Sequence, residues 1–447
     1  MTATETLATW VATVPRTRTA AVAPLATAGM RDAIGCILAG AQEETPRRVA
    51  AAVTRWGSGP SHVIGSGRAL PSPWAALVNG TAAHVLDYDD TFGPLSGHAT
   101  AVLVPSILAL GEEIAADGPA LLDALVVGLD VMAAVGRGVN PKHYALGWHA
   151  TSTIGAIGAA GACARLMNLD ARGAQDALSL AVSMAAGTRM QLGAPAKSLH
   201  AGLAAKAGIL AATLAAEGVG GAAEALEGQW RFVEMFTGRP APEGVMAPPA
   251  DDALLAIESD GLAFKAYPTC AATHLSLDAL LALRPHFAPE EVTTIETDLP
   301  LVLRRNLMHP DPRTGMEARF SMEYCLAAAA TQGALGPADF EGEALVRPSV
   351  RALMPRIAMQ GLPEPDGAPP PATTVRVRLA DGRVLTETRT IRRGSPDNPM
   401  TEAEQVAKFR DCASRLLPPE RIAAAEAAIA GLAAGGSARD LVALLSG

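Results

Sequence analysis

The stretch TSTIGAIGAAGACARL, residues Thr151–Leu166, consists mostly of alanine, glycine and other small residues. Alanine is the best helix former because it loses no side-chain entropy in the helix. The whole chain shares this bias, since hydrophobic residues make up 49% of it and aromatic residues only 4%. A core built mainly from Ala, Leu, Val and Ile predicts closely packed helices.

Similar helical patterns continue on both sides of this stretch, as far as about Gly238. Short Gly and Pro breaks separate them, and Ser72-Pro73 is typical of a helix start. The other expected helices are residues 74–87, 100–116, 120–139, 171–186, 201–216 and 220–226. A possible loop with a short extended piece is expected at residues 58–65.

The pattern changes after Met235. Residues 239–252 are rich in Pro and Gly, which is typical of a surface connection. Residues 291–299 are β-branched and strand-like, and residues 373–391 alternate like a β-hairpin. Helix returns at Thr401, which forms a capping-box pattern with Glu404.

These patterns predict a mainly α fold with two domains, which a chain of 447 residues is long enough to form. A large all-helical domain would use both chain ends, residues 1–263 and 399–447. A smaller α+β lid domain, residues 264–398, would be inserted between them. A site between the two would suit a closing lid.

The formal net charge of −9 and the lack of a Lys/Arg-rich run argue against a nucleic-acid partner. The five cysteines are scattered, with no C-x-x-C pair, so neither a disulfide framework nor a metal cluster is expected. Residues 1–16 lack a secretory signal pattern. The most apolar stretch, residues 119–138, contains Asp123, Asp130 and Arg137, so it predicts a core helix rather than a membrane span. We therefore expect a soluble, cytoplasmic protein.

The strongest candidate site is the segment from His84 to His98, which contains Asp87, Asp90 and Thr91. If the helix continued, these last three would share one face, with His84 one turn earlier. Acidic residues at a helix C-terminus oppose its dipole, and such a local cost is expected where function selects the residues. A solvated acidic helix end is an equally good interpretation, and metal binding by His and Asp is a third.

His149 lies just before the helix that begins near Thr151. The positive potential of a helix N-terminus favours a neutral imidazole that can accept a proton. A structural histidine is the commoner alternative.

Two lysine segments and a tyrosine complete the candidates. Lys197 and Lys206 lie in an Ala-rich region, where a lysine can simply extend to the surface. Lys265 precedes Pro268, which stiffens the loop. Tyr324 is one of only four tyrosines and could supply a hydroxyl contact, although packing is the commoner use.

Together these segments resemble the MmgE/PrpD family over nearly the whole chain. The matching motifs are NGTAAHVLDYDDT (79–91), GWHATS (147–152), KSLHAG (197–202), KAYPTC (265–270), FSMEY (320–324), GSPDNPMT (394–401) and Lys408-Phe409. The family includes 2-methylcitrate dehydratase, cis-aconitate decarboxylase and iminodisuccinate epimerase. The resemblance implies a helical domain with a smaller α+β lid, a homodimer, and no metal or other cofactor.

The resemblance also implies roles for individual residues. The catalytic positions would be Asp87, His98, His149, Lys197 and Lys265. Substrate-binding positions would be Thr91, Tyr324 and His274. Cys270 stands where the decarboxylases carry histidine, which counts against that activity. The segment from Tyr267 to His274 also lacks the acidic and aromatic character of the dehydratases, so the substrate stays open.

The resemblance implies proton transfer next to a carboxylate of a small di- or tricarboxylic acid. In this hypothesis the two lysines bind carboxylates, and the two histidines act as acid and base near neutral pH. We expect a dehydratase-like hydro-lyase, with an epimerase-like isomerase or a decarboxylase-like lyase as alternatives. A non-catalytic helical dimer that binds a small acid, and a metal-dependent hydrolase, are more remote alternatives.

Overall fold

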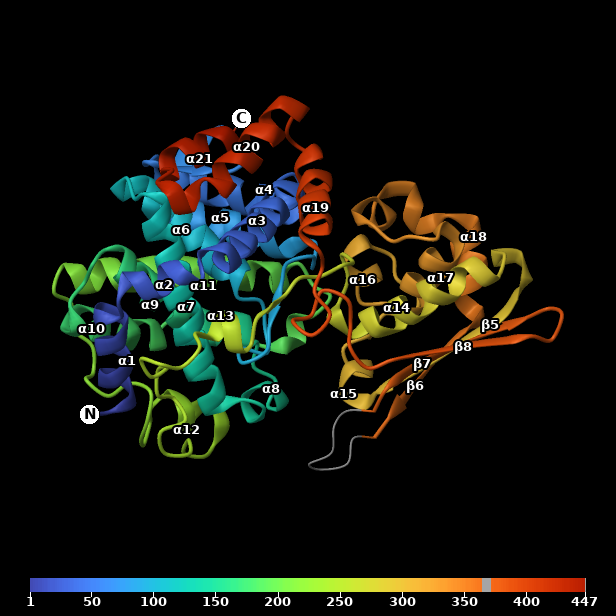
Figure 1. Cartoon of the computed structure of the whole chain (residues 1–447), viewed down its shortest axis with the longest axis horizontal. Helices are drawn as coiled ribbons and strands as arrows, with labels where there is room; N and C mark the ends of the chain where they lie inside the picture. Colours follow the sequence, from blue (N-terminus) through green and yellow to red (C-terminus); the bar gives the residue numbers. More distant parts are fainter. Residues whose placement is uncertain (364–370, 447) are drawn as a thin grey trace.

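The computed structural model describes residues 1–363 and 371–446, which are mainly α-helical with small sheets. The larger hydrophobic core takes residues from both ends of the chain, from Leu7 to Leu262 and from Phe409 to Leu445. Both termini lie in this helical body (Figure 1). Its helices are α1 (Ala3–Thr13), α2 (Arg16–Ala21), α3 (Ala23–Gly40), α4 (Glu44–Val53), α5 (Ser72–Val85), α6 (Thr100–Ile114), α7 (Gly118–Val139), α8 (Lys142–Ala145), α9 (Ala150–Leu166), α10 (Ala171–Val182), α11 (Ala196–Ala216), α12 (Phe232–Thr237), α13 (Ala256–Ser259), α19 (Glu402–Ser414), α20 (Pro419–Ala430) and α21 (Ala438–Leu445).

A second hydrophobic core contains only residues between Ala272 and Leu379. It joins a group of helices to a four-stranded sheet, on the right of Figure 1. Its helices are α14 (His274–Leu283), α15 (Leu301–Arg304), α16 (Gly315–Ala318), α17 (Met322–Gln332) and α18 (Pro348–Leu353), and its strands are β5 (Val292–Pro300), β6 (Ile357–Leu362), β7 (Thr373–Leu379) and β8 (Val384–Arg389).

The strand order in this sheet is β6-β5-β7-β8. β5 runs parallel to β6, with Ile295 opposite Ile357, and antiparallel to β7. β7 and β8 form the expected antiparallel hairpin. Alternate residues of β7 are buried, because α14 and α17 cover one face of the sheet.

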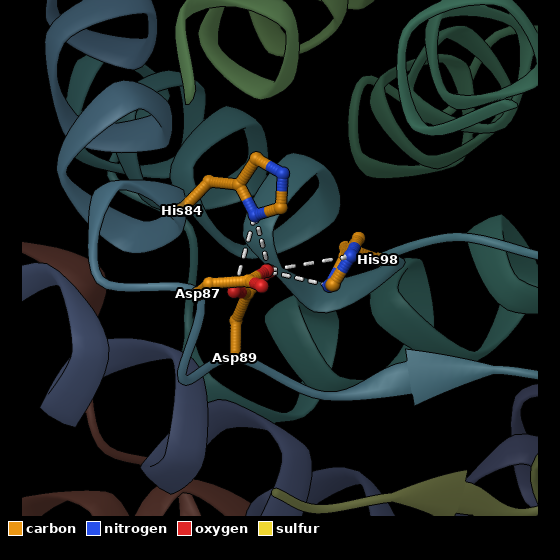
Figure 2. Close-up of side chains that lie close together, drawn as sticks. All are labelled: His84, Asp87, Asp89 and His98. Carbon is orange, nitrogen blue, oxygen red and sulfur yellow. Dashed lines mark hydrogen bonds and ion pairs between the residues drawn. The ribbon is translucent and has the colours of Figure 1, made fainter. Parts of the chain in front are cut away.

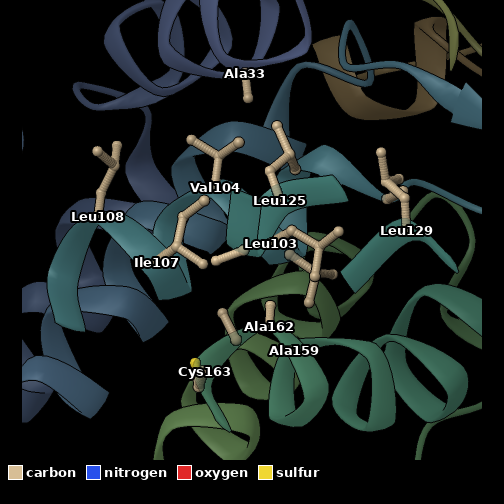
Figure 3. Packing of buried hydrophobic residues seen from close by; sticks show 14 of the residues in the cluster. Ala33, Leu103, Val104, Ile107, Leu108, Leu125, Leu129, Ala159, Ala162 and Cys163 are labelled. Carbon is tan, nitrogen blue, oxygen red and sulfur yellow. The ribbon is translucent and has the colours of Figure 1, made fainter. Parts of the chain in front are cut away.

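Close helix packing explains the small residues of the helical body. Leu103 of α6 contacts the Gly128 region of α7, beside Ala162 of α9, in the core that Figure 3 shows. A Cβ atom on Gly202 of α11 would lie only 2.1 Å from the carbonyl oxygen of Leu77 in α5. The two backbones can approach this closely only without side chains between them. This contact places the second turn of α11 against the middle of α5.

In the described part of the chain, four short strands lie outside the main sheet. β1 (Ser61–Val63) pairs with β2 (Arg68–Leu70), which confirms the extended piece expected in this loop. β3 (Thr91–Phe92) pairs with β4 (Leu262–Ala263), so residues far apart in the sequence meet next to the candidate site.

Most expected helices are confirmed to within a few residues, and so are the hairpin and the Thr401–Glu404 capping box. Two expectations were wrong. Residues 220–226 form no helix, and α5 ends at Val85 rather than at Asp87. Asp87 instead has a positive φ of 52°, so Asp87, Asp90 and Thr91 do not share a helical face.

Two helices, α7 and α11, have the length and hydropathy of a membrane span. In α7, however, 89% of the apolar window is buried against other parts of the protein. α7 is therefore a core helix of the helical body, as expected from its charged residues.

Candidate active site

A cavity of about 420 Å³ lies between segments of the two cores. Its wall includes His98, His149 and Lys197 from the helical body. Lys265, Cys270 and Asn306 also line it. Lys265 and Cys270 lie in the connection to the second core, and Asn306 lies within the range of that core.

Asp87 lines this cavity and is buried. Its carboxylate Oδ1 accepts from Lys197 Nζ at 2.6 Å and lies 2.9 Å from Lys265 Nζ. Burial alone would raise the pKa of Asp87, but the two ammonium groups hold it well below its usual value. Asp87 is therefore ionised at neutral pH, and its single negative charge faces the two positive charges of Lys197 and Lys265.

The loop that carries Asp87 is held by long side chains from distant segments. Lys265 Nζ donates to the Asp87 carbonyl at 2.7 Å, and Arg319 Nε donates to the Leu86 carbonyl at 2.8 Å. Lys408 of α19 donates to the Tyr88 carbonyl, also at 2.8 Å. Three successive carbonyl groups just after the end of α5 are thus satisfied by cations.

Asp89 links two imidazoles, as Figure 2 shows. Its carboxylate lies 2.9 Å from His84 Nδ1 and 3.1 Å from His98 Nδ1. Burial disfavours the charge of Asp89, yet the two histidines hold its pKa well below the usual value. His98 Nδ1 is also 2.9 Å from the Asp90 carbonyl oxygen. Both neighbours of this nitrogen accept hydrogen bonds, so His98 carries its proton on Nδ1. The lone pair is then on Nε2, which lies 3.8 Å from Asp87 Oδ1.

His149 is the N-cap residue of α9, as expected, and it lines the cavity. Its Nδ1 lies 2.9 Å from Nδ1 of His200, a residue of α11. Burial, and next the charge of Lys197, lower the pKa of His149 well below its usual value. Burial also lowers the pKa of His98 and brings that of His84 to about 3. All three imidazoles are neutral at neutral pH.

Two arginines line the cavity in addition to the lysines. Arg189 donates to the Tyr144 carbonyl and, at 2.7 Å, to Asn306 Oδ1. Arg392 donates to the hydroxyl of Thr91. Neither arginine forms an ion pair within residues 1–363 and 371–446, and Arg189 Nε is buried without a hydrogen-bond partner there.

Six of the predicted site residues therefore line one cavity: Asp87, Thr91, His98, His149, Lys197 and Lys265. Their roles in a reaction remain predictions. For Lys197 the alternative of a surface-directed lysine was wrong, because this side chain is buried on Asp87. Lys206 instead lies 5.0 Å from the ring of Trp74.

Tyr324 and His274 do not line the cavity. Tyr324 packs in the second core, and its hydroxyl donates to the carbonyls of Asp339 and Ala344. The hydroxyl of Tyr324 is thus directed to the backbone of the second core, and its substrate contact stays a prediction. His274 is buried against the ring of Tyr267, behind the wall of the cavity.

His200, Arg189, Arg392 and the linking role of Asp89 were not predicted from the sequence. His200 stands inside the quoted motif KSLHAG, and Arg392 comes two residues before Gly394, the start of another motif. Those motifs were the available signals. Arg189 lies in a loop between α10 and α11 and belongs to none of the quoted motifs.

His84, Asp87, Asp89 and His98 each place one potential metal-ligand atom within 4.8 Å of the others. The charge around them is unfavourable for a cation, however. Asp87 is already neutralised by two ammonium groups, which would repel a divalent ion at the same oxygen. We interpret the cluster as a hydrogen-bonded acid–base network.

Both parts of the chain match one known family. The MmgE/PrpD N-terminal domain matches residues 5–244, and the MmgE/PrpD C-terminal domain matches residues 267–432. The chain belongs to the MmgE/PrpD family. The C-terminal match extends into α20, so it includes the returning helix α19 with Lys408 as well as the second core.

Several MmgE/PrpD relatives are named as cis-aconitate decarboxylases. The mouse protein (Mus musculus) is 30% identical over 78% of this chain and 73% of its own length. A cis-aconitate decarboxylase from Aspergillus terreus is 24% identical over 90% of this chain and 87% of its own length. A cis-aconitate decarboxylase-like protein from Aspergillus oryzae is 25% identical over 93% and 91%. These relatives support an enzyme of the lyase type.

Proposed function

We propose that this protein is a cofactor-independent lyase that transfers a proton next to a carboxylate of a small polycarboxylic acid. The observation that carries the proposal is the charge of the cavity. Lys197, Lys265, Arg189 and Arg392 line it, and of the carboxylates that line it Asp87 opposes them, because Asp260 is paired with Arg137. The Asp89 carboxylate, in contact with His98 behind the wall, offsets one more positive charge. The cavity is still positive in a chain whose net charge is −9, and a di- or tricarboxylate would balance it.

The positions of the lysines suit stabilisation of an enolate. When a proton or CO2 leaves the carbon next to a carboxylate, negative charge develops on the carboxylate oxygens. Lys197 and Lys265 are fixed by Asp87 before substrate binds, so they need little reorganisation when this charge appears. His98, with its free Nε2, is the base in this proposal.

Dehydration of a citrate-like acid uses every part of the site. His98 would remove the proton from carbon, and His149 would protonate the departing hydroxyl group. The two imidazoles line the same cavity, as a base and an acid on one substrate must. A single acid is enough for decarboxylation, so the pair favours a hydro-lyase.

Decarboxylation of cis-aconitate is the second candidate, and the names of the relatives favour it. In that reaction CO2 would leave and His149 would protonate the resulting carbanion. Cys270 lines the cavity, and burial raises the pKa of its thiol, so it is a neutral group at pH 7 rather than an acid–base catalyst. An epimerase remains an alternative if both histidines exchange a proton with the same carbon.

NMR in D₂O tests this proposal directly. The purified protein is mixed with citrate, 2-methylcitrate, cis-aconitate or iminodisuccinate, and the spectra show loss of water, loss of CO2 or deuterium at carbon. The Lys197→Ala variant is the control for contaminating activity. If none of these acids reacts and none raises the melting temperature, the proposed function is wrong.

We also propose that the second core acts as a lid and that the protein is a homodimer. The bond between Arg392 and Thr91 joins the two parts at the cavity. Trp230 is 81% exposed and Met235 is 63% exposed, which suits a covered surface in a dimer. Light scattering tests the dimer, and small-angle scattering with and without substrate tests closure. The cytoplasmic location and the lack of nucleic-acid and membrane partners remain predictions.

A further inference from the structure

The hydrogen bond between His149 and His200 is unusual because it joins two Nδ1 atoms. A neutral imidazole carries one proton, on either nitrogen. The bond therefore requires one ring to donate from Nδ1 and the other to accept at Nδ1. Two arrangements meet this requirement, and they place opposite tautomers on His149.

His98 differs in this respect. Its Nδ1 faces the Asp89 carboxylate and the Asp90 carbonyl oxygen, which only accept, so a single tautomer is stable. His149 has no such acceptor at Nδ1. Its tautomer is set only by a second imidazole, which can give or take a proton.

We infer that His200 is a positioning residue that exchanges a proton with Nδ1 of His149, so that His149 can protonate the substrate without becoming charged. The inference rests on the proposed function, because it concerns the acid of that reaction. Lys197 lies close by, and a charged imidazolium beside its ammonium group would be costly.

His149 begins with its proton on Nε2, and its Nδ1 accepts from Nδ1–H of His200. The Nε2 proton moves to the substrate, and the N–H bonding electrons stay on His149. The Nδ1 proton of His200 moves to Nδ1 of His149, which remains neutral. At the same time solvent protonates Nε2 of His200, which therefore also remains neutral. The proton that His98 took from carbon returns to solvent, so the number of protons balances.

Water can reach this last nitrogen. Within the described ranges, Nε2 of His200 has no hydrogen-bond partner in the protein. It is also not one of the fully buried nitrogens that lack a partner, so part of its surface is open to solvent. Nε2 of His84, in contrast, is buried without a partner. His200 therefore connects the buried His149 to solvent, and His84 does not.

Other charged and titratable groups around the pair are few. His149 is influenced by Lys197, His84, His200 and His98, and His200 by Lys197. Burial is the first cause of the lowered pKa of both residues. Neither ring contacts a carboxylate, so nothing near the pair favours a fixed imidazolium.

The first test is His200→Asn. An asparagine amide can still donate to or accept from Nδ1 of His149, but it cannot pass on a proton. His149 could then act as an acid only as an imidazolium. We expect kcat to fall at least ~10-fold at neutral pH, with KM within about twofold. We also expect kcat of the variant to rise as pH falls, over a range where the wild-type value is flat.

Three further variants complete the experiment. His200→Ala should be partly rescued by added imidazole, whereas His149→Asn should not. His62→Asn, on β1 and paired with Glu112, is the control for loss of a histidine away from the cavity. If His200→Asn keeps the wild-type kcat and pH profile while His149→Asn is inactive, the inference is wrong and the proposed function stands.

A second measurement does not need a substrate. In ¹⁵N-histidine NMR of the wild-type protein, we expect coupling between the two Nδ1 atoms across their hydrogen bond, and its loss in His200→Asn. Fixed tautomers with no coupling would overturn the inference even if the enzyme is active. Coupling in a protein that transforms none of the four acids would contradict the proposed function alone.

Discussion

Replacing Asp87 with asparagine should strongly destabilise the helical body. Asp87 is buried at φ 52°, a conformation that asparagine tolerates well, so the backbone need not change. The substitution removes one charge and leaves the ammonium groups of Lys197 and Lys265 without a counter-ion, at 2.6 and 2.9 Å from the altered atom. Removing one partner of a buried ion pair costs about 3–5 kcal/mol. Since two cations lose their partner here, we expect the upper part of that range.

Urea unfolding followed by tryptophan fluorescence measures this cost. All five tryptophans belong to the helical body, so the signal reports on the part that contains Asp87: Trp10, Trp56, Trp74, Trp148 and Trp230. An unchanged m-value with a lower midpoint would identify a change in stability. The control is Glu44→Gln, which breaks the exposed pair with Arg48 and should change stability by no more than about 0.5 kcal/mol.

The pH dependence gives a second test of the same reasoning. The folded-state pKa of Asp87 is depressed, so its stabilising effect is complete above the unfolded pKa of about 3.9. That effect is lost as pH falls towards the folded-state pKa. The loss of unfolding free energy in the Asp87→Asn variant should therefore be constant between about pH 5 and about pH 7. It should shrink below about pH 4. A deficit under about 1 kcal/mol at pH 7 would refute the role of Asp87 as the counter-ion.

Four further outcomes are expected. Lys197→Ala should lower kcat/KM by at least ~10²-fold while the protein stays folded by circular dichroism; near-wild-type turnover would remove it from the site. Arg189→Met should raise KM about 10- to 100-fold with little change in kcat, because a charged hydrogen bond of about 1.5–3 kcal/mol is lost; an unchanged KM would exclude it from substrate binding. The pH profile of kcat/KM should rise with pH through a pKa below the usual 6.5 and then level, because burial lowers the pKa of the base His98; a profile that falls there would contradict this. Tyr324→Phe should retain activity and lose about 1 kcal/mol of unfolding free energy, since only a buried hydrogen bond disappears; lost turnover in a stable variant would return Tyr324 to the site.

Local sequence patterns predicted most helices because alanine propensity and Gly/Pro breaks act within one segment. They failed for residues 220–226, where a short run of helix formers follows two glycines. So short a helix is marginal without strong packing. They also failed at the end of α5, where neither Leu86 nor Asp87 is a helix breaker. Contacts from distant segments decide that boundary, and no local pattern contains them.

The candidate site was predictable as a set of residues but not as a geometry. Motifs identified Asp87, His149 and both lysines, because the family resemblance covers them. The pairing of His149 with His200 joins positions 51 residues apart, on α9 and α11. It depends on how these helices pack. Tyr324 shows the reverse case, since its motif was correct but its side chain points into the second core.

The end of α5 explains why an acid can stand where the helix dipole opposes it. An aspartate at a helix C-terminus is unfavourable, and free carbonyl groups there need donors. Lys265, Arg319 and Lys408 supply donors and positive charge to three successive carbonyls. They come from the connection to the second core, from that core and from the returning helix α19. The unfavourable loop is thus stable only when all three parts of the chain are assembled. One of the three cations, Lys265, also lines the cavity. Folding and charge balance at the proposed active site therefore depend on the same contacts.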